Sequence, residues 1–200
     1  MFQDCDMRLL SRLIGLRWSA GLPLLMAIAA AVALTWMPAI WGTPAGQALA
    51  QVSAQATVVS TADATQVLGE ATFSETATGL EMSATLSNVS PGLHGFHIHA
   101  AGSCADGGKG AGGHYNPLST EHGYLPGDGL GDAHAGDMGN ILIAADGSGS
   151  LTVTLPGLTL AGDAPFIQDR AVILHAKPDD FGQPTGNAGG RVGCGIIAAS

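Results

Sequence analysis

All seven histidines of this chain lie between positions 94 and 175. Two of them, His97 and His99, are two residues apart in an apolar run. Alternate residues of a strand face the same side, so both imidazoles point one way while Phe96 and Ile98 point the other. Neutral imidazole is the commonest metal ligand in proteins, and clustering distinguishes a metal site from scattered polar residues. This spacing therefore predicts metal binding.

Further candidate ligands follow this pair. They lie in a glycine-rich stretch or end an apolar run, and they are His114, His122, His134, Asp137 and His175. Together with the first pair they offer six imidazoles and one carboxylate, enough for two metal ions. His94 is assigned to the core instead, because its neighbour Gly95 offers no second ligand.

Short β-like runs separated by turn residues position these side chains. The run from Leu80 to Leu86 alternates apolar and polar residues, and Asp146-Gly147-Ser148 is a hairpin-type connection. The pattern predicts an all-β fold, an eight-stranded antiparallel sandwich or flattened barrel. The expected strands are 54–60, 66–75, 80–86, 93–99, 140–145, 149–155, 169–175 and 191–198.

Two long connections, 100–139 and 176–190, interrupt this rhythm. Loops longer than about 12–15 residues without secondary structure are usually functional or disordered. Here they hold most of the candidate ligands, so we expect two functional loops that metal ions and a disulfide keep ordered.

The N-terminal part differs from the rest in composition. Residues 1–17 carry three arginines, residues 18–41 carry no charge, and Ala48-Leu49-Ala50 has the small-x-small pattern of a cleavage site. This order predicts a secretory signal over 1–50, hence a periplasmic or extracellular protein. The alternative is an uncleaved membrane anchor, since 18 or more apolar residues can span a bilayer. The prolines within the apolar stretch favour cleavage.

The predicted exported part comprises a lead-in with the first strand, 51–66, and a β domain, 67–200. It holds four Lys and Arg residues against fourteen Asp and Glu, a formal charge of −10. Such a surface opposes binding to nucleic acid or anionic membrane. A membrane is therefore a partner only if the leader is retained.

Cys104 and Cys194 are the two cysteines of the exported part. An even pair in an exported domain predicts a disulfide, with two buried thiols as the alternative. A bridge across a loop of roughly 90 residues stabilises the fold by about 4 to 5 kcal/mol in loop-closure entropy, before strain is subtracted.

Four motifs, in this order, resemble those of the copper,zinc superoxide dismutases, and the similarity covers essentially the whole of 51–200. Any one of them could arise by chance, but four with every ligand type intact leave little room for another family. The resemblance implies a Greek-key arrangement of the strands. The motifs are GFHIH (95–99), GHYNP (113–117), HAGDMGN (134–140) and GNAGGRVGCG (186–195).

The resemblance also implies one copper and one zinc ion that share a ligand. Four imidazoles in a distorted square suit Cu(II), and a closed tetrahedral set is typical of structural zinc. His114 would bridge the ions and exchange a proton during turnover. The copper ligands would be His97, His99, His114 and His175, and the zinc ligands His114, His122, His134 and Asp137.

By the same resemblance, Asp179 would join His97 to His122 and fix the orientation of both rings. Arg191 would attract and dock an anion of the size of superoxide. The loop 176–190 is shorter than in the better-known eukaryotic pattern and lacks its Glu-Glu-x-x-Lys cluster. We still expect local attraction of anions, with a rate that falls as salt is raised.

The implied activity is disproportionation of superoxide to dioxygen and hydrogen peroxide by a Cu(II)/Cu(I) cycle, with Arg191 and His114 as catalytic residues. One alternative is a domain of the same fold that binds or delivers copper without turnover. A dinuclear metallohydrolase fits less well, because such sites favour bridging carboxylates. A monomer and a homodimer both remain open.

Overall fold

Alternating burial along the strands follows the period-two pattern of the sequence. In β1 (Ser53–Ser60) the side chains of Ala54, Ala56 and Val58 are buried, and those between them face outward. A computed structural model describes residues 52–162 and 165–200. The predicted signal, 1–50, lies outside the described residues. Within them, no helix combines the length and apolar character needed to cross a membrane.

The described residues form nine strands and two very short helices. The helices are a 3₁₀ turn at Lys109–Ala111 and α1 at Leu125–Asp128. The other strands are β2 (Val67–Thr76), β3 (Gly79–Leu86), β4 (Gly92–His99), β5 (Asp137–Ile143), β6 (Gly149–Leu155), β7 (Ala171–His175), β8 (Arg191–Ile196) and β9 (Ala198–Ala199).

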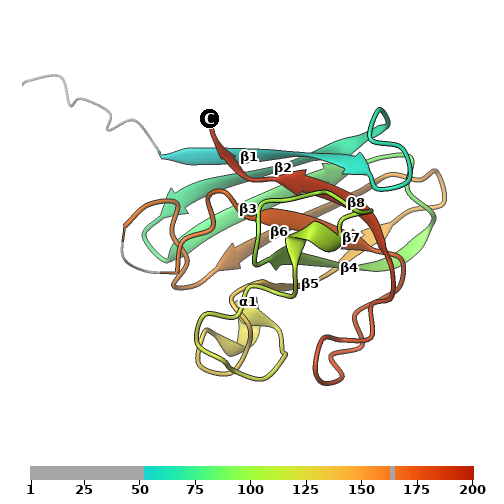
Figure 1. The fold of residues 1–200 in the computed structure, drawn as a ribbon. Coiled ribbons are helices and arrows are strands. Elements are labelled where there is room, and N and C mark those ends of the chain that lie inside the picture. Colours follow the sequence, from blue (N-terminus) through green and yellow to red (C-terminus); the bar gives the residue numbers. More distant parts are fainter. Residues whose placement is uncertain (1–51, 163–164) are drawn as a thin grey trace, which may run out of the picture. The chain divides into compact units, whose positions relative to one another are not determined.

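All pairings between neighbouring strands are antiparallel, and eight strands close into a barrel in the order β1-β2-β3-β6-β5-β4-β7-β8. The closure is weak at two places. β5 pairs with β6 only at Ile143 and Gly149, and β1 pairs with β8 at two positions. The barrel is therefore flattened into two layers, β1-β2-β3-β6 and β5-β4-β7-β8 (Figure 1). This confirms the predicted eight-stranded antiparallel all-β fold, to which β9 adds two residues.

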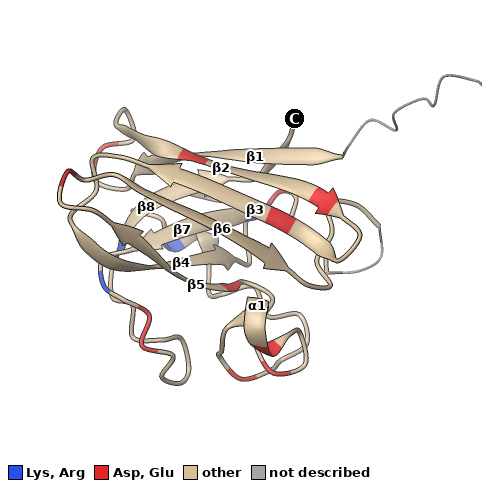
Figure 2. Ribbon diagram, turned by 180° about the vertical axis from the view of Figure 1, so that it is seen from behind, with Lys and Arg blue, Asp and Glu red and all other residues tan. Residues whose placement is uncertain are grey.

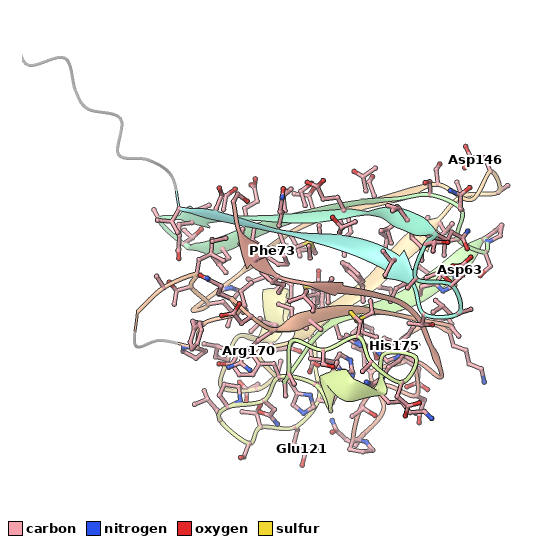
Figure 3. The ribbon with its side chains drawn as sticks, turned by 45° about the horizontal axis from the view of Figure 1, so that its top comes forward. Asp63, Phe73, Glu121, Asp146, Arg170 and His175 are labelled. Atoms are coloured by element: carbon pink, nitrogen blue, oxygen red, sulfur yellow. A yellow bond between two sulfur atoms is a disulfide. The ribbon has the colours of Figure 1, made fainter. Side chains whose placement is uncertain are left out.

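The core fills the space between the layers. Phe73 on β2 and Phe96 on β4 are fully buried there, and Figure 3 shows Phe73 between the strands. β4 is buried on both faces over its last six residues. Phe96 and Ile98 point into the core, so His97 and His99 must point outward. The long loops that lie below this layer in Figure 1 cover these two imidazoles.

Most strand ends lie within two residues of the sequence-based expectation, and three elements differ more. β5 begins at Asp137 instead of residue 140, because Asp137 pairs with His97 on β4. The predicted strand 191–198 is split, since the backbone of Ile197 bonds to Asp169 and Arg170. α1 lies in a loop expected to contain no secondary structure, and four residues are too few to show helical periodicity.

Candidate metal centre

Two groups of potential metal ligands lie side by side between β4, β7 and the loop 100–136. In each group, one ligand atom per residue lies within 4.8 Å of all the others. All seven residues named from the sequence are thereby brought together, and His114 belongs to both groups. The groups are His97, His99, His114 and His175, and His114, His122, His134 and Asp137.

His99 and His175 direct unprotonated nitrogens into the first group. Nδ1 of His99 lies 2.9 Å from Gly112 O, and Nδ1 of His175 lies 3.2 Å from Gly189 O. A carbonyl oxygen only accepts hydrogen bonds, so each Nδ1 carries the proton. Burial lowers the pKa of His99 to about 2 and that of His175 to about 3, so both rings are neutral. Their Nε2 lone pairs then face each other at 3.3 Å, a repulsive arrangement that a cation between them would relieve.

His97 contributes a third free lone pair to this group. Its Nε2 donates to Asp179 Oδ2 at 2.8 Å, so its Nδ1 is unprotonated. This Nδ1 is buried and has no hydrogen-bond partner. Burial also lowers the pKa of His97 to about 4 and outweighs the opposing effect of Asp179. A buried polar atom without a partner is costly, so the site fits a metal ion that nitrogen donors hold.

The second group surrounds the carboxylate of Asp137. Its Oδ1 lies 2.8 Å from Nδ1 of His114 and 3.2 Å from Nδ1 of His134, and its Oδ2 lies 2.8 Å from Nδ1 of His122. The backbone amides of Gly123 and His134 also donate to this carboxylate. Three imidazole nitrogens and one carboxylate are a donor set suited to closed tetrahedral zinc.

His122 lies between two carboxylates. Its Nε2 is 3.0 Å from Asp179 Oδ1, and its Nδ1 faces Asp137 without the alignment of a hydrogen bond. Burial opposes protonation of this ring, but the contacts with Asp137 and Asp179 outweigh it and raise the pKa of His122 to about 9. The imidazolium and imidazole partners also hold the pKa of Asp137 and of Asp179 well below the usual range, against burial. Without a metal, a proton on His122 therefore balances charge that zinc would otherwise balance.

His114 is the central ring of the cluster. Its centroid lies 4.2 Å from that of His97 and 5.3 Å from that of His122. Because its Nδ1 faces Asp137, the remaining nitrogen, Nε2, is the atom it offers to the first group. The structure thus presents a copper-like histidine site and a zinc-like histidine and aspartate site, bridged by His114.

A cavity of about 200 Å³ opens above the first group. His99, His114 and His175 line it, whereas His97 is buried below. Arg191 forms part of its wall and donates from Nη1 to Gly108 O and from Nη2 to Gly112 O. These bonds fix the guanidinium at the mouth of the cavity. Figure 3 shows His175 on the side of the strands that faces the long loops.

Positive charge is scarce in the described part of the chain, and some of it lies close to the cavity. Asp and Glu mark β2, β3 and the surroundings of α1 in Figure 2. Lys177 follows His175 by two residues, and Arg191 begins β8. These two cations therefore lie near the cavity although residues 51–200 carry a formal charge of −10.

The predicted disulfide is present between Cys104 and Cys194, with Cα atoms 5.7 Å apart. It joins the loop that carries Gly108 and Gly112 to β8, which carries Arg191. The bridge therefore holds the arginine and its two carbonyl partners in one rigid unit.

His94 has the core position assigned to it from the sequence. It is buried, its Nδ1 lies 2.7 Å from His175 O and its Nε2 lies 2.8 Å from Ser90 O. Both ring nitrogens lie within hydrogen-bond distance of backbone oxygens, and the ring belongs to neither group of candidate ligands.

Two amide side chains near the site were not singled out from the sequence. Asn140 donates from Nδ2 to Asp179 O at 2.9 Å and accepts from Asp179 N at 2.7 Å. Gln183 makes the same kind of paired contact with the backbone of His122. Each amide thus holds the main chain of a residue in the hydrogen-bonded triad of Asp179, His97 and His122.

The fold and the donor set define an all-β protein with a two-metal site that a shared histidine bridges. The family model for copper/zinc superoxide dismutase matches residues 67–197. This chain belongs to that family.

Solved structures of similar proteins agree with this assignment. A double mutant of a SOD-like protein from Bacillus subtilis is 34% identical, with a TM-score of 0.64 over 72% of this chain and 96% of that one. The clock protein EA4 is 33% identical, with a TM-score of 0.64 over 75% of this chain and 96% of that one. A SOD-like protein from Bacillus subtilis is 30% identical, with a TM-score of 0.61 over 70% of this chain and 95% of that one.

Proposed function

We propose that this protein disproportionates superoxide to dioxygen and hydrogen peroxide. Two superoxide anions and two protons give one molecule of each product, so the site must attract an anion, exchange one electron at a time and supply protons. One observation carries the proposal. The cavity that Arg191 borders opens onto three of the four copper-type histidines, whereas His114 is the one member of the zinc-type group among its lining residues.

The ligands named from the sequence would hold both ions: copper at His97, His99, His114 and His175, and zinc at His114, His122, His134 and Asp137. Copper, when bound, supplies the one-electron exchange between Cu(II) and Cu(I), and zinc supplies fixed positive charge at the shared imidazole.

The protein's own residues then account for binding and proton supply. Arg191 carries a charge that it cannot lose at neutral pH, and its guanidinium is fixed at the mouth of the cavity, where it attracts and docks superoxide. When its Nε2 is not held by copper, His114 would carry there one of the two protons that pass to the reduced product, because its Nδ1 remains on the side of Asp137. Asp179 keeps His97 and His122 in fixed orientations, so little rearrangement accompanies each turnover.

The test is superoxide decay after pulse radiolysis, measured with chain loaded with one copper and one zinc ion. We expect rapid catalysed decay that disappears when the metals are removed with a chelator and returns when they are restored. The matched control is His175→Ala loaded under the same conditions, which keeps the zinc-type group intact. A fully loaded wild-type chain that left the decay unchanged would refute the proposal.

The competing function is copper binding or delivery without turnover. The described residues retain every copper-type ligand and the cavity arginine, which supports catalysis over storage. The same decay measurement separates the two functions. A dinuclear hydrolase remains the poorer fit, because the seven donors include only one carboxylate.

We also propose that the protein is exported to the periplasm or the extracellular space. The basic and apolar composition of 1–50 supports this location, and so does the disulfide, which persists in oxidising compartments.

A further inference from the structure

Gln183 holds the backbone of a zinc-type ligand from the other long loop. Its Oε1 accepts from His122 N at 3.0 Å, and its Nε2 donates to His122 O at 2.8 Å. The two residues are 61 positions apart in the sequence. Among the candidate ligands in the described ranges, His122 is the one whose backbone N–H and C=O are both bound by a single side chain.

The turn that carries Gln183 also covers the ring of His122. The ring of Phe181 stacks on that imidazole with centroids 6.4 Å apart and an angle of 19° between the planes. The backbone of Gly186 lies close to the hydrogen bond between His122 Nε2 and the carboxylate of Asp179. A Cβ added at Gly186 would lie 2.6 Å from His122 Nε2 and would also overlap the carboxylate of Asp179. His122 is therefore held at its backbone, ring face and Nε2 by one short segment, 179–186.

This segment also reaches the copper-type site. Thr185 within it, and Asn187 directly after it, line the cavity above His99 and His175. A side chain that fastens the segment to His122 therefore ties the wall of the cavity to the zinc-type group. Gln183 belongs to the loop 176–190. Its side chain binds the backbone of the loop 100–136, which carries the zinc-type ligand His122.

We propose that Gln183 is a positioning residue for zinc: its paired bonds fix the main chain of His122, so that Nδ1 of that ring is directed at the metal before the metal binds. The inference rests on the proposed identity of the second group as a zinc site, but it does not depend on dismutase turnover. An unfixed His122 would have to be ordered at the moment of binding, which lowers affinity. Residues that orient metal ligands typically contribute 10-fold to 100-fold in metal affinity.

The experiment measures zinc affinity of the full chain in competition with a chromophoric chelator, without copper. We expect Gln183→Ala to bind zinc about 10-fold to 100-fold more weakly than wild type. Gln66→Ala is the matched control, because Gln66 is an exposed glutamine in the turn between β1 and β2, and its affinity should equal that of wild type. Gln183→Glu keeps the acceptor for His122 N but places a carboxylate against His122 O, so its affinity should also fall.

A second readout separates positioning from general stability. Co(II) bound in place of zinc has visible ligand-field bands that report the geometry of its donors, and these bands should shift in Gln183→Ala but not in Gln66→Ala. If both Gln183 variants bound zinc within twofold of wild type, with unchanged cobalt bands, the inference would be overturned. That result would leave the proposed function intact. Conversely, weaker zinc binding in a chain without dismutase activity would support the inference and refute the proposed function.

Discussion

The Nε2 atoms of His99 and His175 lie 3.3 Å apart, and a backbone carbonyl holds the Nδ1 proton of each ring. Two lone pairs that face each other at this distance repel, and the fold maintains the contact through the strands that carry the rings. β4 ends at His99 and β7 ends at His175, and these strands pair along four residues. The protein therefore holds the copper-type donors close together in advance, and a cation bound between them would relieve the repulsion.

Removing one of these rings tests the ligand set. We expect His175→Ala to lose copper binding and the proposed dismutase activity while zinc remains bound. The loss of copper affinity should exceed the roughly 10-fold to 100-fold typical of residues that only orient ligands. Metal analysis after dialysis checks this expectation, with circular dichroism as the control for the fold. Retention of one copper per chain at wild-type affinity would remove His175 from the ligand set.

Arg191 provides the test of anion attraction. Arg191→Ala should retain both metals but slow the bimolecular reaction by about 10-fold or more, since focused charge raises association rates by about 10-fold to 1,000-fold. The rate of Arg191→Lys should lie between those of wild type and Arg191→Ala, because lysine keeps the charge but loses the paired hydrogen bonds to Gly108 O and Gly112 O. The rate of the wild type should decrease as ionic strength rises, and this dependence should weaken in Arg191→Ala. Full activity in the alanine variant would contradict the docking role.

Metal binding should release protons unequally at the two sites. His122 has a pKa raised to about 9, so at pH 7.5 zinc must displace its proton, and about one proton should be released. The rings of His97, His99 and His175 are already neutral at that pH, because burial lowers their pKa values to between about 2 and about 4. Calorimetric titrations with zinc in buffers of different ionisation enthalpy measure the released protons. A zinc enthalpy that did not depend on the buffer would contradict the assignment.

The metal-free protein should be most stable near pH 6.5. Below that pH, the unfolded chain takes up protons on His97, His99 and His175 that the folded chain refuses, so stability falls toward pH 4. Above it, the folded chain retains a proton on His122 that the unfolded chain has lost, so this contribution disappears as pH rises through about 9. Each pKa unit corresponds to about 1.4 kcal/mol.

Urea unfolding between pH 4 and pH 9, with the metals first removed by a chelator, measures how the stability of the metal-free protein depends on pH. The metal-loaded protein is the comparison, and its stability should fall at least as steeply between pH 6.5 and pH 5, because bound cations also keep the proton off His122 in the folded chain. A metal-free protein that became steadily more stable from pH 6.5 down to pH 5 would contradict the depressed pKa values.

The candidate ligands named from the sequence lie together in the structure, because a candidate ligand is recognised by its own side-chain type. Spacing placed His97 and His99 on one face of a strand, and the structure has them there. Asn140 and Gln183 gave no such signal. Each binds the backbone of a residue 39 or 61 positions away, and an amide that contacts a distant backbone leaves no local pattern.

Strand boundaries were missed for a related reason. Asp137 was expected in a loop because the residues around it do not alternate in polarity. Its strand begins there because β5 pairs with His97 on β4, a contact between residues forty positions apart. Long-range pairing decides such a boundary, whereas β6, whose limits follow local alternation and a hairpin turn, was predicted at its observed bounds.

The proposed export of the protein has a simple optical test. All three tryptophans, Trp18, Trp36 and Trp41, precede the expected cleavage position after Ala50, whereas Tyr115 and Tyr124 follow it. The processed chain should therefore emit near 300–310 nm as a tyrosine-only protein, and the full-length chain should show the longer-wavelength emission of tryptophan. Intact mass measurement of the same sample is the control, because it locates the N-terminus independently. Tryptophan emission from purified native protein would mean that the segment is retained, and the anchored alternative would then replace the cleaved signal.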